Sequence, residues 1–511
     1  MRKGRWRQTL LCGTLAAMMS LSACAKEDDA KTTAAAASAE TTSANATQEQ
    51  TTAPETSAAV TTEAATTEAS TEALTEAPAT EALTQAPTEA PTKVAPTTEA
   101  PTITEEKTTE APMDFYDKMI ADSFIQTGNT ARMHKIIEKA KQGEDVTIAY
   151  IGGSITEGAL ATTQEKTYAR LSYQYFADTF GTGENVHFLN AGFSGTPSTL
   201  GIIRYDRDML TRGYTTPVTY PDIIFIEFAV NDGDDPTFGE AYESMIRQAL
   251  NAPNEPAVFL LFSVFESEFN LQDRLMPLGK HYDLPMISIK NAVIPQIHAG
   301  NITNREFFAR DGYHPMDYGH QIMCDCITYC FDRIAEAETD ASYTVPETTV
   351  IGNSFENMTM IDTTTTDPAI VINPGSFTAK DKTSGVFQFD NKREKLGDNW
   401  SHTKDGGSES FTMRLNCKSL IMAYKRSSNK AAAGAVEVLV DGEPVKPLIS
   451  PSFNQKANVA RVESYSAGGW NNPWLAIILD EETAADHTIE VKMAEGDEEK
   501  EFTIFAFGYT K

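Results

Sequence analysis

Between residues 113 and about 340, short apolar strands alternate with helical segments, and this alternation limits the fold more than any other feature of the chain. Residues 223–226 read Ile-Ile-Phe-Ile, so both faces of this strand are apolar. Such a strand fits a parallel sheet that is covered by helices on each side. We expect strands near 146–151, 186–190, 222–228, 257–262 and 285–289, and helices near 114–141, 166–180, 198–211, 238–251, 270–280 and 317–336. The sequence therefore predicts a three-layer α/β/α domain over residues 113–343.

After residue 344 the pattern changes to β-branched and aromatic residues that alternate with polar ones, separated by Gly, Asn and Asp turns. Residues 435–440 read Ala-Val-Glu-Val-Leu-Val and are followed by Asp-Gly, which predicts a strand that enters a hairpin. Residues 488–492 and 502–507 have the pattern of further strands. We therefore expect a second domain over residues 344–511, an all-β sandwich of the jelly-roll type.

The segment before the α/β region consists almost entirely of Thr, Ala, Glu, Pro and Ser. The unit Thr-Glu-Ala-Pro recurs, for example at 75–78 and 88–91, and residues 27–112 contain no aromatic residue. So little can be buried that the entropy cost of ordering the chain is not offset. We expect residues 24–112 to be a disordered linker.

The first residues have the pattern of a secretory signal, with four basic residues followed by an apolar stretch from Leu10 to about Met19. This stretch is too short to cross about 30 Å of hydrocarbon. Cys24 follows the small residue Ala23, which resembles the bacterial lipobox and implies cleavage before Cys24 and lipid attachment to its thiol. We expect residues 1–23 to be a lipoprotein signal peptide and the mature chain to be anchored on the outer face of a bacterial membrane. A plain signal peptide with an incidental cysteine is the alternative.

The chain has a formal net charge of -30, which argues against nucleic acid as a partner. Cys324, Cys326 and Cys330 fall on one predicted helix. Zinc binding would be one interpretation, but the three cysteines lie among apolar residues at helical spacing, where cysteine packs as a small hydrophobe. We expect neither a metal nor another cofactor.

Chemically useful residues follow the predicted strands, at the edge where open α/β sheets collect ligands. Ser154 comes directly after the first strand and a pair of glycines, so its hydroxyl should lie on a sharp strand-to-helix turn. Gly195 follows the second strand and Asn231 the third, while Asp311 and His314 stand just before the last helix. These five residues are the candidates for one site.

Together the five residues can supply each role that acyl transfer to a serine requires. A serine nucleophile needs a base and a carboxylate that orients the base, which His314 and Asp311 provide. The tetrahedral intermediate needs hydrogen-bond donors aimed at its oxyanion. The backbone N–H groups of Ser154 and Gly195 and the amide of Asn231 are the candidates.

The order Ser154, Gly195, Asn231 and Asp311-x-x-His314 resembles the SGNH, or GDSL-type, hydrolase superfamily. The resemblance covers residues 113 to about 340. It implies a flavodoxin-like α/β/α fold in which Ser154 is the nucleophile, the second and third blocks complete an oxyanion hole, and His314 with Asp311 is the base.

Two positions depart from this pattern. Gly153 stands where the family usually has Asp, and Ala229 stands where it usually has Gly. Neither change removes a catalytic group. The choice of Gly195 over Gly192 as the second donor rests on the pattern Ser-Gly-Thr at 194–196.

Four further acidic residues lie near these motifs. Glu227 belongs to an apolar strand, and we expect it to be buried and structural. Asp232, Asp234 and Asp235 resemble part of a calcium loop but lack the remaining ligand spacing. We expect them to be solvated and to cap the next helix.

The substrate is suggested by Trp400, Trp470 and Trp474, which all fall in the predicted β domain. Exposed rings there would stack on sugars, whereas buried rings would anchor a core, and the sequence leaves both open. A tethered esterase with such a domain resembles enzymes that deacetylate polysaccharides. The sequence thus predicts a carbohydrate O-acetylesterase, with Trp470 and Trp474 as candidate substrate-binding residues. A lipase for long acyl chains, or a non-catalytic surface lipoprotein that binds polysaccharide, are the alternatives.

Overall fold

The computed structural model describes residues 114–211, 219–390, 393–445 and 461–511. All of them belong to one compact unit, Glu105–Lys511. The predicted signal peptide (1–23), the predicted lipidation site Cys24 and the predicted linker (24–112) lie outside the described residues.

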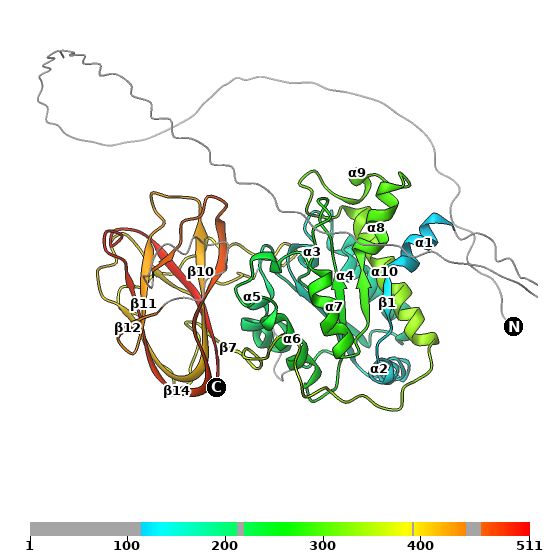
Figure 1. Ribbon diagram of the computed structural model, residues 1–511, viewed down its shortest axis with the longest axis horizontal. Helices are drawn as coiled ribbons and strands as arrows, with labels where there is room; N and C mark the ends of the chain where they lie inside the picture. Colours follow the sequence, from blue (N-terminus) through cyan, green and yellow to red (C-terminus); the bar gives the residue numbers. More distant parts are fainter. Residues whose placement is uncertain (1–113, 212–218, 391–392, 446–460) are drawn as a thin grey trace, which may run out of the picture. The chain divides into compact units, whose positions relative to one another are not determined.

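A six-stranded sheet forms the centre of the first half of this unit (Figure 1). Its strands are β1 (Phe124–Gln126), β2 (Val146–Gly152), β3 (Val186–Gly192), β4 (Ile223–Glu227), β5 (Ala257–Phe262) and β6 (Met286–Ser288). Their order is β1-β6-β5-β4-β2-β3, and all neighbours are parallel except β1, which is antiparallel to β6. Every residue of β2, β4 and β5 is buried, as expected for a sheet covered on both faces.

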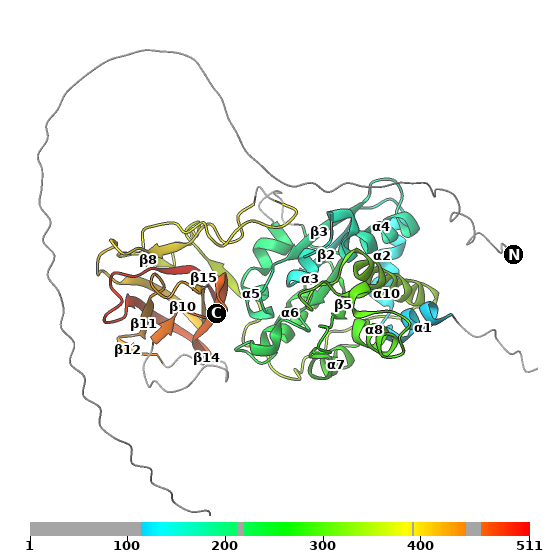
Figure 2. The ribbon, with the colours of Figure 1, turned by 90° about the horizontal axis from the view of Figure 1, so that it is seen from above.

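Helices cover the two faces of this sheet. They are α1 (Phe115–Asp122), α2 (Ala131–Lys141), α3 (Ser154–Glu157), α4 (Tyr168–Phe180), α5 (Ser198–Ile203), α6 (Glu240–Leu250), α7 (Gln272–His281), α8 (Ile289–His298), α9 (Asn304–Phe307) and α10 (Asp317–Glu336), with 3₁₀ turns at Gln164–Lys166 and Asp232–Asp234 and a π-helical segment at Asp206–Thr211. One apolar core joins Tyr150 of β2 to α1, α2, α4, α8 and α10, and a second joins Ile151 to α5, α6 and α7 (Figures 1 and 2). The predicted three-layer α/β/α architecture is confirmed. None of the helices in the described ranges is long and apolar enough to cross a membrane.

The second half is all β, as predicted. Its strands are β7 (Thr359–Ile361), β8 (Val371–Asn373), β9 (Trp400–His402), β10 (Phe411–Ser427), β11 (Ala435–Val440), β12 (Glu443–Pro444), β13 (Arg461–Glu463), β14 (Trp470–Met493) and β15 (Phe502–Thr510). They form one antiparallel sheet with the central order β12-β11-β14-β10-β15-β7. The predicted hairpin is present, because Asp441 and Gly442 both have positive φ and connect β11 to β12. We call the part of the chain that contains β7 to β15 the β domain.

The β domain shares an apolar core with the α/β part. Ile421 of β10, Leu475 of β14 and Phe505 of β15 belong to the same buried cluster as α5 and α6. Gly508 lies at this contact, since a Cβ there would be only 2.5 Å from Cγ1 of Ile203. The two parts therefore pack directly on each other.

One local prediction was wrong, and one helix was missed. The helix expected over residues 114–141 is divided into α1, β1 and α2, because β1 pairs with β6 and forms the edge strand of the sheet. The helix α8 was not predicted, and it contains Pro295, a residue that rarely lies inside a helix. In both segments tertiary contacts decide the structure and the local pattern does not.

Candidate active site

Ser154 lies at the carboxyl edge of the six-stranded sheet, at the end of β2. It is the first residue of α3 and follows β2 after Gly153 alone. Because β2 lies between β3 and β4, the loops that carry Gly195 and Asn231 extend from the strands on either side of it. The sheet order therefore brings the first three predicted site residues to one place.

His314 connects Ser154 to Asp311 by hydrogen bonds. Its Nε2 atom lies 2.8 Å from Oγ of Ser154, and its Nδ1 atom lies 2.6 Å from Oδ2 of Asp311. The segment that carries both residues immediately precedes α10. The arrangement has a hydroxyl, a base and an orienting carboxylate in sequence, which is the geometry required for an activated serine.

The environment of Asp311 favours its ionised form. Partial burial acts to raise the pKa of Asp311, but hydrogen bonds from the His314 ring and from the backbone N–H groups of Tyr313 and His314 outweigh it, so the pKa is lowered. Asp311 is therefore a carboxylate at neutral pH. A carboxylate at this position accepts the Nδ1–H of His314 and so holds the ring with Nε2 toward Ser154.

Asn231 lies directly against the serine turn. A Cβ at Gly153 would be 2.3 Å from Oδ1 and 2.6 Å from Nδ2 of Asn231. No side chain fits between them while Asn231 keeps this position. This contact gives a physical reason why residue 153 is glycine here, where the SGNH pattern usually has Asp.

Gly195 has a positive φ of 68°, a conformation that glycine adopts without strain. Its Cα faces Trp470 of β14, because a Cβ at residue 195 would lie 2.5 Å from Cζ2 of the indole. Trp470 is nevertheless 56% exposed. The structure thus places one of the two candidate tryptophans against the loop beside Ser154, with much of its surface open to solvent.

Trp474 has a different environment. The guanidinium of Arg426 lies 3.8 Å from the centre of its ring, and the ring packs against the core of the β domain. Trp400 is 6% exposed and belongs to that core. The interpretation as core anchors therefore fits Trp400 and Trp474, whereas Trp470 is the one whose ring lies exposed beside the site.

Exposed aromatic residues also flank His314, and the sequence analysis did not identify them. Tyr313 is 54% exposed and Phe269 is 40% exposed. Phe265 joins them, with its ring centre 5.0 Å from that of Tyr313 and 6.0 Å from that of Phe269. The only signal in the sequence was their position after β5 and next to the predicted base.

The carboxylates behind the site are buried. Glu227 is fully buried at the end of β4 and accepts a hydrogen bond from Oγ1 of Thr156 at 3.0 Å. Burial raises the pKa of Glu227 to about 7. Its predicted structural role agrees with this position.

The prediction for the aspartates after Asn231 was wrong in part. Asp234 is exposed, but Asp232 and Asp235 are buried. Asp232 accepts the N–H of Ser198 at 2.8 Å and so caps α5, which is not the helix that follows it in the sequence. Parallel strands bring the two loops together, and the sequence spacing does not reveal that contact.

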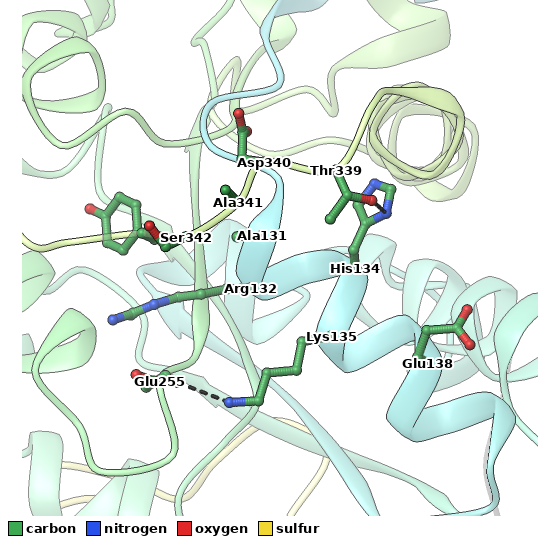
Figure 3. A pocket seen from close by; sticks show the side chains of 11 residues that line it. Ala131, Arg132, His134, Lys135, Glu138, Glu255, Thr339, Asp340, Ala341 and Ser342 are labelled. Carbon is green, nitrogen blue, oxygen red and sulfur yellow. Dashed lines mark hydrogen bonds and ion pairs between the residues drawn. The ribbon is translucent and has the colours of Figure 1, made fainter.

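A cavity of about 650 Å³ lies elsewhere, between the start of α2 and the residues that follow α10 (Figure 3). It is at the opposite end of α10 from His314, and a helix of this length spans about 30 Å. Several of the polar side chains that line it pair with one another: Lys135 pairs with Glu255, and His134 contacts Thr339 (Figure 3). This cavity is separate from the site at Ser154.

The three cysteines of α10 are buried, and Cys326 and Cys330 belong to the apolar core as the helical pattern predicted. Across the described residues, no group of three or more His, Cys, Asp or Glu side chains is arranged to hold a metal ion.

Comparison with known proteins identifies the α/β part. Residues 150–322, which carry all five candidate residues, match the GDSL-like lipase/acylhydrolase family. A solved two-domain esterase (CEX) active on acetylated mannans, co-crystallized with mannopentaose, is 27% identical, with a TM-score of 0.62, over 77% of this chain and 98% of that one. A second structure of a two-domain esterase (CEX) active on acetylated mannans is 26% identical, with the same TM-score, over 77% and 99% of the two chains. The chain is an SGNH-type esterase with a C-terminal β domain. No curated protein sequence gives a significant match.

The buried carboxyl group of Glu227 should make the stability of this SGNH esterase depend on pH. Because the pKa of Glu227 rises from its ordinary 4.5 to about 7, the unfolded chain releases this proton at a lower pH than the folded one. As pH rises from 4.5 to 7, the free energy of unfolding of the wild type should therefore decrease by on the order of 3 kcal/mol relative to that of Glu227→Gln. Urea unfolding at pH 4.5 and 8 measures the difference. Glu138→Gln, at an exposed position of α2, is the control, and equal differences at both pH values for Glu227→Gln would contradict the prediction.

Proposed function

We propose that this esterase removes O-acetyl groups from polysaccharides outside the cell, through an acyl-enzyme on Ser154. The observation that carries the proposal is the contact of Trp470 with Gly195, which brings an exposed aromatic ring of the β domain to the loop beside Ser154. The esterases active on acetylated mannans match this chain across both domains, and this likeness supports the same substrate class.

In the proposed reaction, His314 takes the proton of the Ser154 hydroxyl as Oγ attacks the acetyl carbonyl carbon. The negative charge on the carbonyl oxygen is stabilised by the N–H groups of Ser154 and Gly195 and by the amide of Asn231. His314 then gives the proton to the sugar oxygen as the ester bond breaks, and the acetyl group remains on Ser154. Water, deprotonated by His314, then attacks the acetyl carbon; the bond to Oγ of Ser154 breaks, acetate leaves, and His314 returns the proton to Oγ. Ionised Asp311 stabilises the protonated ring in each half of the cycle.

The exposed rings on both sides of the site support a glycan as the alcohol part of the ester. Trp470 lies beside Gly195, and Tyr313 adjoins His314. Large aromatic faces contribute contact area at little conformational cost, and the apolar faces of sugar rings can pack on them. A polysaccharide that crosses Ser154 could contact both rings.

We further propose that the enzyme is held at the cell surface by a lipid on Cys24 and a long acidic tether. The basic and apolar N-terminus and the Ala-Cys pair at 23–24 support this location. A tether of 89 residues (24–112) would have a mean reach of roughly 50 Å or more. Such a reach would let the esterase act on polysaccharides beyond the membrane.

Ser154→Ala should abolish acetate release from acetylated mannan, xylan, pectin and an aryl acetate. Asp311→Asn should lower kcat by about 10⁴-fold, because it removes the charge that orients and stabilises protonated His314. Acetate release by purified protein measures both effects. Asp441→Asn is the matched control, because Asp441 makes a similar 2.8 Å contact with His487 far along the chain in the β domain, and this variant should keep wild-type kcat.

Three results would contradict parts of this proposal. Full activity of Ser154→Ala would refute the mechanism. Faster hydrolysis of aryl palmitate than of aryl acetate would indicate a lipase. An inactive wild type that binds polysaccharide would indicate a non-catalytic surface lipoprotein.

Trp470→Leu should raise KM for acetylated polysaccharide by about fivefold, which corresponds to the loss of one aromatic contact of about 1 kcal/mol. KM for an aryl acetate should change less, because that substrate does not extend to the β domain. Steady-state kinetics on the two substrates measure the difference. Trp474→Leu is the matched control, and an equal change of KM on both substrates in Trp470→Leu would refute a role in glycan binding.

Cys24→Ala should move the protein from the membrane fraction to the medium, because the acceptor of the lipid is lost. Fractionation of the producing bacterium, with mass spectrometry of the N-terminal peptide, measures the change. Cys12→Ala, within the apolar stretch, should leave the protein in the membrane fraction. Retention of the Cys24→Ala protein on the membrane would refute the anchor.

A further inference from the structure

Glu157 is a buried carboxylate one turn after Ser154, and the proposed reaction does not use it. It is the last residue of α3 and is 5% exposed. Its Oε2 atom accepts the backbone N–H of Ser194 at 2.7 Å and also the hydroxyl of Ser194. Ser194 directly precedes Gly195. The short helix that carries the nucleophile is thus bonded to the loop that carries the second candidate oxyanion donor.

The same carboxylate is bonded to residues that lie between β8 and β9. Its Oε1 atom accepts the backbone N–H of Gln388 at 2.8 Å, and Nζ of Lys395 lies 3.2 Å from Oε2. The side chain of Lys395 is 8% exposed. The side chain of Gln388 also donates to the carbonyl oxygen of Gly158, at 3.1 Å. Residues of the β domain therefore supply part of the polar shell around Glu157.

Apolar contacts hold the same loop on its other sides. The ring of Phe387 packs edge-on against Phe193, with 5.6 Å between the ring centres. Nζ of Lys395 lies 4.8 Å from the centre of the Phe193 ring. Trp470 covers Gly195. The segment 193–195 is thus enclosed by α3 and by two separate parts of the β domain.

These contacts make the position of the loop sensitive to Glu157. A buried carboxylate is costly unless hydrogen bonds and a counter-ion compensate it, and here four donors converge on it. Moving Ser194 away from Glu157 would leave part of that charge without a partner. The native arrangement therefore resists displacement of the residue next to Gly195.

We propose that Glu157 is a positioning residue, through which Lys395 and Gln388 of the β domain hold the Ser194–Gly195 loop so that the N–H of Gly195 is aimed at the oxyanion. The proposal rests on the role given above to Gly195. Since an oxyanion donor acts mainly in the transition state, loss of this support lowers kcat and leaves KM nearly unchanged.

The test uses the full protein with Glu157→Gln, Lys395→Met and Ser194→Ala. Loss of a whole oxyanion donor lowers kcat by roughly 10²- to 10³-fold, so we expect a displaced donor in Glu157→Gln to lower kcat on an aryl acetate by about tenfold. The other two variants each remove one contact and should have smaller effects in the same direction. The affinity for phenylboronic acid, whose serine adduct places a tetrahedral oxygen at the oxyanion site, should weaken by the same factor as kcat.

Arg247→Met is the matched control. Arg247 of α6 pairs with Glu356 at 2.8 Å and so also joins the α/β part to the segment that leads into the β domain, but it does not contact the 193–195 loop. It should lower thermal stability without changing kcat or inhibitor affinity. A purely structural Glu157 would give the same pattern as this control.

The outcomes separate this proposal from the proposed function. An active wild type with unchanged kcat and boronate affinity in a folded Glu157→Gln would overturn the positioning role alone. If Glu157→Gln does not fold, unchanged kinetics in both Ser194→Ala and Lys395→Met would overturn it. A wild type that hydrolyses no ester would refute the proposed function together with this role.

Discussion

The site depends on one constraint, which is that β3, β2 and β4 are neighbours in a parallel sheet and end at the same edge. The chain leaves β2 through Gly153 into Ser154, while the loops after β3 and β4 must run on either side of that turn. Asn231 consequently lies against Gly153 on one side, and the loop of Gly195 lies on the other. Asp311 and His314 come from another place, the segment just before α10, which does not directly follow any of these three strands.

The sequence was sufficient for the parts of this arrangement that depend on local patterns. Strands such as β4 are apolar on both faces and are therefore recognisable, and the residues just after them follow from the strand ends. Contacts between distant segments leave no such pattern. Nothing around Lys395 indicates that its side chain reaches Glu157, and nothing around Trp470 indicates Gly195, because each contact exists only after the β domain packs on α5 and α6. The three-residue strand β1 was also missed, because it depends on pairing with β6, which is distant in the sequence.

The buried acids behind the site show a cost of this geometry. Burial raises the pKa of Glu227, Asp232 and Asp235. Asp232 holds the start of α5, and Asp235 accepts hydrogen bonds from Thr199 and Thr237. These hydrogen bonds hold the loop after Asn231 against α5. Glu157 differs from these acids because it has Lys395 as a counter-ion.

The connection between the two parts constrains the proposed binding of a polysaccharide. An accessory module on a flexible linker could bind glycan at any distance from the catalytic serine. Here the residues that lead into the β domain are fixed to α6, since Glu243 accepts the N–H groups of Val350 and Gly352 and Arg247 pairs with Glu356. Trp470 also lies against Gly195, which places an exposed aromatic face beside the loop next to the nucleophile. In the proposed reaction, a sugar stacked on Trp470 would lie beside the loop next to Ser154, so we propose that the β domain acts as a wall of the active site and adds to the selection of the ester.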